Sequence, residues 1–163
     1  MPHGVLSDYH LDNHFLKGNI MGLDMYLSAK RYLWDTNKND KVLSEEIDKI
    51  LEESDYIKEG ALGRTKWITR EAFYWRKAYA IHHWFVENVQ DGDDDCEEYY
   101  VDREKLKELL ETLKQALTDH DILPCQDDDT EWHFDHIKAT ISALEKLLSE
   151  NLDQWDFYYQ SSW

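Results

Sequence analysis

Apolar and polar residues alternate from Leu23 to Leu33, and this pattern restricts the fold more than any other feature of the chain. Positions 23, 25, 27 and 29 are apolar, whereas positions 24, 28 and 30 are polar. A period of two is typical of a β-strand with one buried face. The segment therefore predicts a strand, so we expect the chain to contain a sheet.

Helical spacing of apolar residues marks four further segments. Ser44 is in the position of an N-cap for a short helix over 44–54, and apolar residues recur at helical spacing across 71–89. Asp102 can cap a third helix, and the fourth follows the acidic loop near position 129. The inward positions of these last two helices are Leu106, Leu109, Leu110, Leu113 and Leu117 in one, and Ile137, Ile141, Leu144 and Leu148 in the other.

Three weaker strand signals complete the pattern, at residues 64–70, 99–101 and 155–160. Strands at both ends of the chain, without regular strand and helix alternation, favour the α+β class. We therefore expect a small antiparallel sheet packed against about four helices, in a single domain.

The length of 163 residues is close to the commonest domain size. Residues 1–20 have no clear period and Met21 reads as a natural start, so we expect an N-terminal extension over 1–20 and one domain over 21–163. The sequence holds two cysteines and no CxxC pair, which favours a reducing cytoplasm. No run approaches the ~20 apolar residues that a membrane span needs.

The excess negative charge is concentrated in the second half. Residues 1–81 hold 13 Asp and Glu against 12 Lys and Arg, whereas residues 82–163 hold 22 against 6, which together give the net charge of −17. Such a field repels nucleic acid and anionic membranes and attracts basic surfaces. We therefore expect a basic protein partner, with no direct nucleic-acid or membrane binding.

Two acidic runs are interrupted by aromatic residues, which suits a basic protein groove better than solubility alone does. Neither run contains Lys or Arg. Carboxylates on a rigid support can imitate the phosphates of a nucleic acid, and aromatic side chains can anchor the contact. The predicted partner-binding residues are Asp91, Asp93, Asp94, Asp95, Glu97, Glu98, Tyr99, Tyr100, Asp127, Asp128, Asp129, Glu131 and Trp132.

A weaker pattern from Asp35 to Glu46 resembles the calcium loop of EF-hand proteins. Asp35, Asn37 and Asn39 occupy the first, third and fifth positions, and Glu46 occupies the twelfth. The sixth position, which favours glycine, is Asp40, and the preceding segment alternates like a strand. The competing interpretation is a polar turn before a capped helix, and calcium binding at this loop is kept as an alternative.

A small-molecule site is the main alternative to partner binding. If 71–89 is one helix, then Arg76, Tyr79 and His83 can share a face with His82 beside it. A guanidinium, a phenol and an imidazole together can hold a phosphate or a carboxylate. The alternative ligand-binding residues are Arg76, Tyr79 and His82, with Gln160 and Ser161; structural roles at the core rim are the competing interpretation.

The sequence gives no strong support for catalysis. His133 and His136 have metal-ligand spacing, yet spacing identifies no third or fourth ligand, and carboxylates around Cys96 would weaken it as a nucleophile. The GxSxG, P-loop, GxGxxG and HExxH motifs are absent. We therefore predict no catalytic residue.

The chain contains several short segments that recur together in one family: GLDMYL at 22–27, YWRKA at 74–78 with Ile81 and His82, QDG at 90–92 with DDC at 94–96, YYV at 99–101, and YYQSSW at 158–163. With these segments the chain resembles a family of small, uncharacterised bacteriophage proteins, over Met21 to Trp163. It departs from the family pattern in two places: Tyr79 stands where Asn is favoured, and the segment after Pro124 is acidic where Gly and Phe are expected.

The resemblance implies a phage origin and the host cytoplasm, and it names no reaction. Small acidic phage proteins are similar in charge and size to inhibitors that occupy the nucleic-acid groove of a defence nuclease, including anti-CRISPR proteins. The sequence therefore predicts an acidic, DNA-mimicking inhibitor of a basic host protein.

Overall fold

Eight helices and strands form the part of the chain that the computed structural model describes, which is residues 22–54, 56–125 and 130–163. No helix in those ranges is both long and apolar enough to cross a membrane. In chain order the elements are β1 (Asp24–Tyr32), α1 (Lys38–Glu53), β2 (Trp67–Arg76), α2 (Tyr79–Asn88), β3 (Tyr99–Val101), α3 (Arg103–Ala116), α4 (Thr130–Ser149) and β4 (Asp156–Ser162).

The four strands form one antiparallel sheet in the order β2-β1-β4-β3. β1 and β2 form a hairpin whose register shifts after Leu27, which is the mark of a β-bulge. β4, although it comes last, lies between β1 and β3. The two inner strands, β1 and β4, therefore meet across a long separation in sequence.

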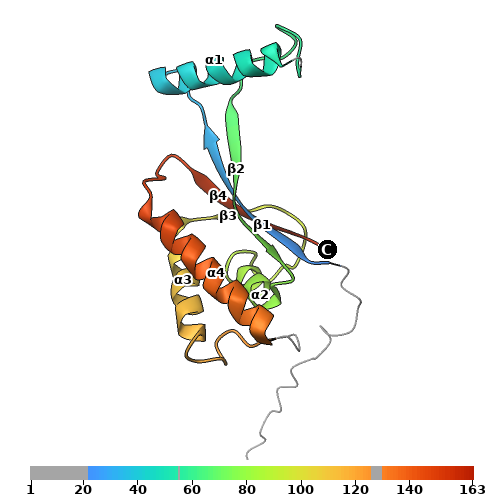
Figure 1. The fold of residues 1–163 in the computed structure, drawn as a ribbon, viewed down its shortest axis with the longest axis vertical. Helices are drawn as coiled ribbons and strands as arrows, with labels where there is room; N and C mark the ends of the chain where they lie inside the picture. Colours follow the sequence, from blue (N-terminus) through green and yellow to red (C-terminus); the bar gives the residue numbers. More distant parts are fainter. Residues whose placement is uncertain (1–21, 55, 126–129) are drawn as a thin grey trace, which may run out of the picture.

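One face of the sheet is covered by α2, α3 and α4 (Figure 1). The alternation in β1 explains this, because Met25 and Leu27 are fully buried while Tyr26 between them is partly exposed. On the same covered face, the Trp75 indole donates a hydrogen bond to Thr140 of α4 at 2.7 Å, and the Phe85 ring of α2 stacks on Tyr159 of β4 at 3.9 Å. The core lies between this face and the three helices.

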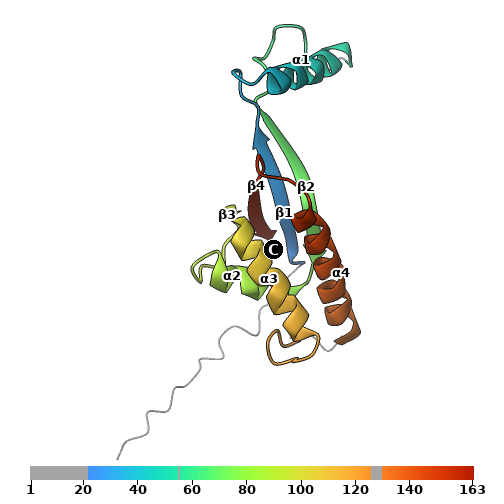
Figure 2. The ribbon, with the colours of Figure 1, turned by 90° about the vertical axis from the view of Figure 1, so that its left-hand side faces the viewer.

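The hairpin of β1 and β2 extends beyond the core, and α1 crosses its far end (Figures 1 and 2). Asn37 caps α1, because its side chain accepts hydrogen bonds from the backbone N–H groups of Asn39 and Asp40. Asp40 pairs with Arg31 of β1, so the first turn of α1 is tied to the hairpin. The molecule is elongated because this end carries no second layer of helices.

The predicted α+β class is confirmed, with four helices and a four-stranded antiparallel sheet. The strand expected over 23–33 is β1, and the short strand at 99–101 is β3 with the bounds expected. The Asp102 side chain caps α3 as predicted, accepting a hydrogen bond from Lys105 N at 2.7 Å.

The helix expected over 71–89 is wrong in its first half. Residues up to Arg76 belong to β2, and the helix begins only at Tyr79. The reason is long-range pairing: Trp75 lies opposite Met25 and is 1% exposed, so the sheet gains more burial than a helical turn would. Lys77, with a φ of 55°, then turns the chain from strand to helix.

The cap expected at Ser44 is also wrong, because α1 begins at Lys38. Ser44 is a buried residue inside the helix, and its hydroxyl donates to the Thr65 carbonyl oxygen at 2.7 Å. The same finding removes the EF-hand conformation from Asp35 to Glu46. Residues 38–46 are helical, so the oxygen atoms of Asn39 and Glu46 cannot converge as they do in a calcium loop.

Candidate functional site

The acidic segment, defined as residues 91–98, connects α2 to β3 and is held in place by the C-terminal strand. Ser161 of β4 donates its hydroxyl to the Asp95 carbonyl oxygen at 3.1 Å, and the Gln160 amide donates to the Cys96 carbonyl oxygen at 2.8 Å. The segment begins with a turn in which Asp91 and Gly92 have positive φ angles of 54° and 85°. Hydrogen bonds at both ends therefore fix the backbone of the acidic segment.

Three of its carboxylates are engaged within the protein. Asp94 contacts the His82 ring at 3.0 Å, and Asp95 accepts a hydrogen bond from the Tyr99 hydroxyl at 2.8 Å. Glu98 pairs with Lys30 of β1 at 2.5 Å. These interactions tie the acidic segment to α2, β3 and β1, and they engage three of the carboxylates that were expected to bind a partner.

The remaining carboxylates of the acidic segment are Asp91, Asp93 and Glu97. All three are exposed, and none forms an ion pair with a residue of the described part of the chain. Their backbone is held by the contacts of their neighbours, so they project from a fixed turn. A partner would meet three negative charges whose positions are set before binding.

His82 is the centre of a buried hydrogen-bonded chain behind the acidic segment. Its Nε2 lies 3.0 Å from Asp94 Oδ1, and its Nδ1 lies 2.7 Å from the Tyr159 hydroxyl. A carboxylate can only accept, so Nε2 carries a proton, and because burial lowers the pKa of His82 and keeps the ring neutral, Nδ1 accepts from the Tyr159 hydroxyl. Both nitrogens are thus satisfied, and the imidazole is neutral.

The environment stabilises this arrangement. Burial lowers the pKa of His82 below its ordinary value of 6.5, although the Asp94 carboxylate opposes that shift. Burial and the same carboxylate raise the pKa of Tyr159 above its ordinary value. Neither group changes its charge near neutral pH, so this chain of hydrogen bonds acts as a structural connection between α2, the acidic segment and β4.

The face of the sheet opposite the helices carries a group of tyrosines, of which the sequence predicted Tyr100 as a partner-binding residue and not Tyr26, Tyr74 or Tyr158. We call it the open face. Tyr26 and Tyr74 lie opposite each other with ring centroids 5.4 Å apart, and Tyr100 and Tyr158 form a second pair at 5.8 Å. Lys30 lies over the Tyr158 ring at 4.7 Å, as well as pairing with Glu98. The sequence held one signal for this group: an aromatic residue stands in β1 where the alternation predicts a polar one.

The second predicted acidic run lies largely outside the described residues, because Asp127, Asp128 and Asp129 are not among them. Glu131 and Trp132 are both exposed, in the first turn of α4. Trp132 packs edge-on against His136 at 4.7 Å, beside the start of α2. Tyr99 and Tyr100 lie instead on β3 at the sheet edge, so Trp132 lies on a different element from these two tyrosines.

The residues of the alternative ligand site are only partly brought together. Arg76 is the last residue of β2, and Tyr79 is the first residue of α2, so they do not share a helix face with His83. His82, Gln160 and Ser161 do converge, but each makes a hydrogen bond to the acidic segment. These five residues therefore form no common pocket lining.

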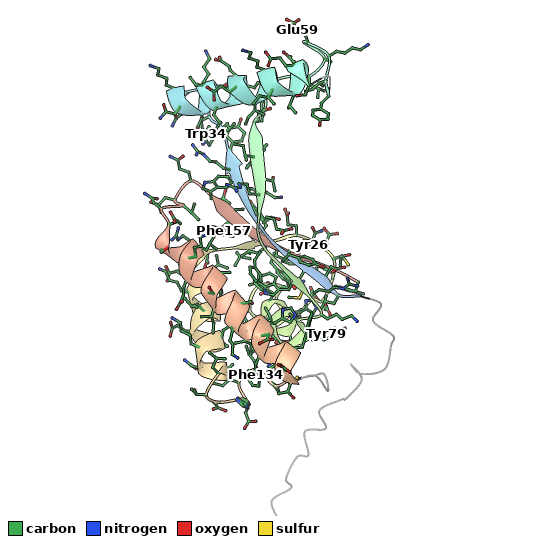
Figure 3. All side chains as sticks on the ribbon, in the orientation of Figure 1. Tyr26, Trp34, Glu59, Tyr79, Phe134 and Phe157 are labelled. Atoms are coloured by element: carbon green, nitrogen blue, oxygen red, sulfur yellow. The ribbon has the colours of Figure 1, made fainter. Side chains whose placement is uncertain are left out.

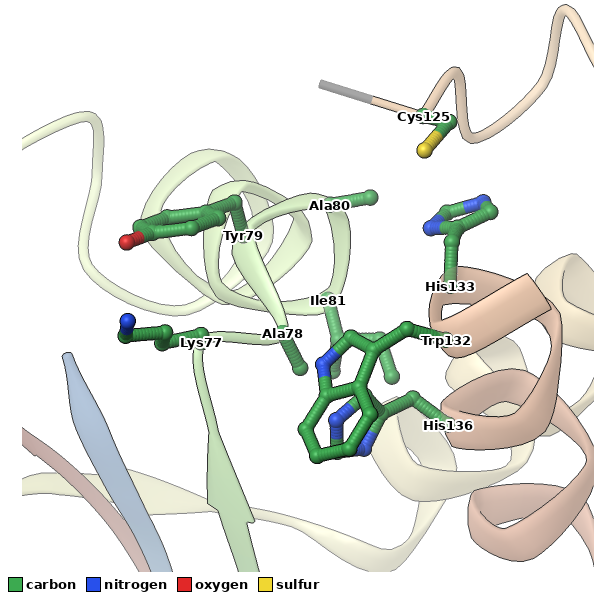
Figure 4. A pocket seen from close by; sticks show the side chains of 9 residues that line it. All are labelled: Lys77, Ala78, Tyr79, Ala80, Ile81, Cys125, Trp132, His133 and His136. Atoms are coloured by element: carbon green, nitrogen blue, oxygen red, sulfur yellow. The ribbon is translucent and has the colours of Figure 1, made fainter. Parts of the chain in front are cut away.

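A small hollow lies between the start of α2 and the start of α4 (Figure 4). Its cavity volume is about 10 Å³, which is room for about one water molecule. Nε2 of His133 donates a hydrogen bond to the Leu123 carbonyl oxygen at 3.0 Å, because a carbonyl oxygen can only accept. The lining residues are Lys77, Ala78, Tyr79, Ala80, Ile81, Cys125, Trp132, His133 and His136.

His133 and His136 do not belong to a metal site within the described ranges, where no group of three or more His, Cys, Asp or Glu side chains is arranged to hold a metal ion. Burial lowers the pKa of His136 below 6.5, and its Nε2 is buried without a hydrogen-bond partner. The hollow is too small for a nucleotide as it stands. The acidic segment with the open face is therefore the better candidate for function.

Comparison of the chain with protein-family models, with curated proteins and with solved structures finds no match.

Proposed function

We propose that this chain is a phage-encoded acidic inhibitor that binds a basic protein surface through the acidic segment and the neighbouring tyrosines. The partner class that we favour is a host defence nuclease, with its nucleic-acid groove as the basic surface. Binding would then be competitive, because the carboxylates pair with the Lys and Arg side chains that otherwise grip phosphates. The host cytoplasm is the compartment that this proposal requires.

The observation that carries the proposal is the fixed display of Asp91, Asp93 and Glu97 on the segment that leads into β3, the strand of Tyr100. Tyr100 is 57% exposed and lies against Tyr158, so it offers a rigid aromatic surface on the strand that follows the unpaired charges. Aromatic anchors surrounded by complementary charge are typical of strong protein interfaces. A loop needed only for solubility does not require this degree of anchoring.

The net charge of −17 adds a long-range contribution. It should accelerate encounter with a basic partner, and salt should weaken that attraction. The proposal therefore predicts that affinity for the partner falls as the ionic strength rises. A partner held mainly by the open face, without the carboxylates, would bind almost equally well at low and high salt.

The test compares two triple variants that remove the same charge. The first variant carries Asp91→Asn, Asp93→Asn and Glu97→Gln. The control carries Asp121→Asn, Asp153→Asn and Glu111→Gln, at three exposed carboxylates that form no ion pair within the described part of the chain. Immobilised wild-type protein is used to capture proteins from host lysate at ~0.1 M and ~0.5 M salt, between which the Debye length falls by roughly half.

A captured nucleic-acid-handling protein is then purified, and its binding to labelled DNA or RNA is measured by fluorescence polarisation with each variant as competitor. We expect wild type and the control triple to displace the nucleic acid, and the first triple to lose displacement by about tenfold or more. Equal competition by both triples, or no competition by wild type, contradicts the proposal.

A further inference from the structure

The far end of the hairpin exposes more large apolar side chains than the rest of the described chain. We define the arm as residues 30–70, which comprise the outer part of β1 and β2 together with α1. Figure 3 shows Trp34 and Glu59 at this end, away from Phe134 and Phe157 in the body. Six of the eleven strongly exposed large hydrophobic residues lie in the arm: Trp34, Val42, Ile50, Tyr56, Leu62 and Trp67.

α1 is attached to the hairpin by polar contacts. Of its residues, Asp40 and Ser44 are the buried ones, and both bond to the hairpin or its adjoining loop. Asp48 accepts from the Thr65 backbone N–H at 2.9 Å, and Arg64 donates to the Leu33 carbonyl oxygen at 2.7 Å. These polar contacts orient α1 on the hairpin, and three of its five apolar residues, Leu43, Ile47 and Leu51, are half-buried.

The other two apolar residues of α1, Val42 and Ile50, are open to solvent. Ile50 is 60% exposed and Val42 is 45% exposed, and no residue of α1 belongs to the hydrophobic core. Around the outer end of the strands, Trp34 and Trp67 pack edge-on against Tyr32 at 4.6 and 4.9 Å, yet both remain more than half exposed. Exposed large apolar side chains gathered at one end of a molecule are typical of an interaction site.

The charge of the arm favours a second copy of this chain as its binding partner. The arm holds nine Lys and Arg and nine Asp and Glu, so its net charge is zero, whereas the rest of the chain holds nine against 26 and carries the whole −17. Two copies of this chain repel each other wherever their bodies approach. The neutral arm, at the far end from the body, is the part where a second copy can approach without that cost.

α1 also fits an antiparallel arrangement with its own copy. Val42 and Ile50 lie four residues before and four residues after Glu46, so a twofold axis at Glu46 places Val42 of one helix beside Ile50 of the other. The end that carries Lys38 and Lys41 then lies beside the end that carries Glu52 and Glu53. The two helix dipoles also oppose each other in this arrangement.

We propose that the arm is a homodimerisation surface, in which α1 of one chain packs antiparallel on α1 of a second copy. The inference stands independently of the proposed function. Its consequence is an assembly with the neutral arms at the centre and one acidic body at each end. A dimer of this form presents two acidic segments far apart, so a partner with repeated basic sites is bound with avidity.

The test is sedimentation velocity on the full chain from ~1 to ~100 µM, with two matched variants. Ile50→Glu puts a charge at the proposed contact, and we expect it to weaken dimerisation at least about tenfold, while Leu117→Glu, at a residue 37% exposed outside the arm, leaves it unchanged. Circular dichroism and thermal melting confirm that both variants fold, since neither residue lies in the core.

A third variant gives an effect of opposite sign. Glu46 is exposed and meets its own copy at the twofold axis, so Glu46→Gln removes a repulsion and should tighten the dimer about two- to fivefold. Wild-type protein that is monomeric at every concentration overturns the proposal. So does a dimer that Ile50→Glu leaves intact.

Discussion

The Tyr159 hydroxyl lies 2.7 Å from Nδ1 of His82, and this buried hydrogen bond joins the C-terminal strand to α2 across 77 residues of sequence. The other nitrogen of His82 contacts Asp94 of the acidic segment. Three elements that are distant in sequence are therefore connected through one imidazole ring.

Replacing Tyr159 with Phe should destabilise the protein by about 1–3 kcal/mol, because Nδ1 of His82 loses its donor while it stays buried. Tyr158→Phe is the matched control, since the neighbouring ring lies on the open face. Urea denaturation followed by tryptophan fluorescence measures both. Equal losses for the two variants would show that the hydroxyl of Tyr159 is not special.

The lowered pKa of His82 makes stability depend on pH. Burial disfavours the imidazolium in the folded state, so the unfolded chain, with a histidine pKa near 6.5, binds more protons as the solution is acidified. The stability from neutral His82 is therefore complete above about pH 6.5 and is lost as the pH falls below it. His136, whose pKa burial also lowers, contributes with the same sign.

Urea denaturation at pH 7.5, 6.5 and 5.5 checks this slope, with His82→Gln expected to flatten it. The Asp94 carboxylate raises the pKa of His82 against the effect of burial, so Asp94→Asn should lower that pKa further. An NMR titration of the His82 ring resonances tests the second statement directly. A rise in the His82 pKa in Asp94→Asn contradicts it.

The ion pair of Arg31 and Asp40 should stabilise the arm in particular. The Asp40 side chain is 3% exposed and also accepts a hydrogen bond from Trp34 N at 3.1 Å, so Asp40→Ala leaves two donors without a partner. We expect a loss of about 2–4 kcal/mol in the stability of α1, measured as faster amide hydrogen exchange across 38–53.

The control for that variant is Glu45→Ala, which removes the exposed pair of Lys41 and Glu45 at 3.9 Å. Its effect should stay below about 0.5 kcal/mol. If both substitutions accelerate exchange in α1 equally, then burial of Asp40 does not strengthen its ion pair.

Thr140→Val should cost about 1–2 kcal/mol, because the buried Trp75 indole N–H loses its acceptor while the shape of the side chain is kept. Thr112→Val is the control, since the Thr112 hydroxyl donates only to Glu108 O of its own helix. Thermal melting compares the two. A larger effect at Thr112 would contradict the role assigned to Thr140.

The sequence predicted those helices and strands in which the spacing of apolar residues within the element itself shows which face is buried. The alternation in β1, the Asp102 cap of α3 and the apolar spacing of α4 each reflect one element with one buried face. The segment over 71–76 could not be assigned in this way, because Tyr74 fits the apolar stripe of a helix that continues to Ala78 and Ile81, whereas Phe73 and Trp75 alternate as in a strand. Pairing with β1 decided between them.

The candidate site was predictable as a stretch of sequence and not as an arrangement of charges. Composition identified the acidic segment, but it gave no sign that Asp94, Asp95 and Glu98 bond within the protein. Lys30 is 68 residues from Glu98 and His82 is 12 residues from Asp94, so for these two carboxylates the tertiary fold decides which are engaged and which are open to a partner. The open face escaped notice for the same reason, since β1 and β4 join their tyrosines.

The place of β4 in the sheet constrains how the chain can fold as it is synthesised. β1 can pair with β2 soon after both leave the ribosome, yet its other edge waits for β4, which begins only at Asp156. Until then the unpaired edge of β1 is open to other chains, a condition that favours aggregation and recruitment of chaperones. Closure of the sheet is therefore a late, non-local and slow event. The pairing of the C-terminal strand β4 with β1 is the step that commits the molecule to its native state.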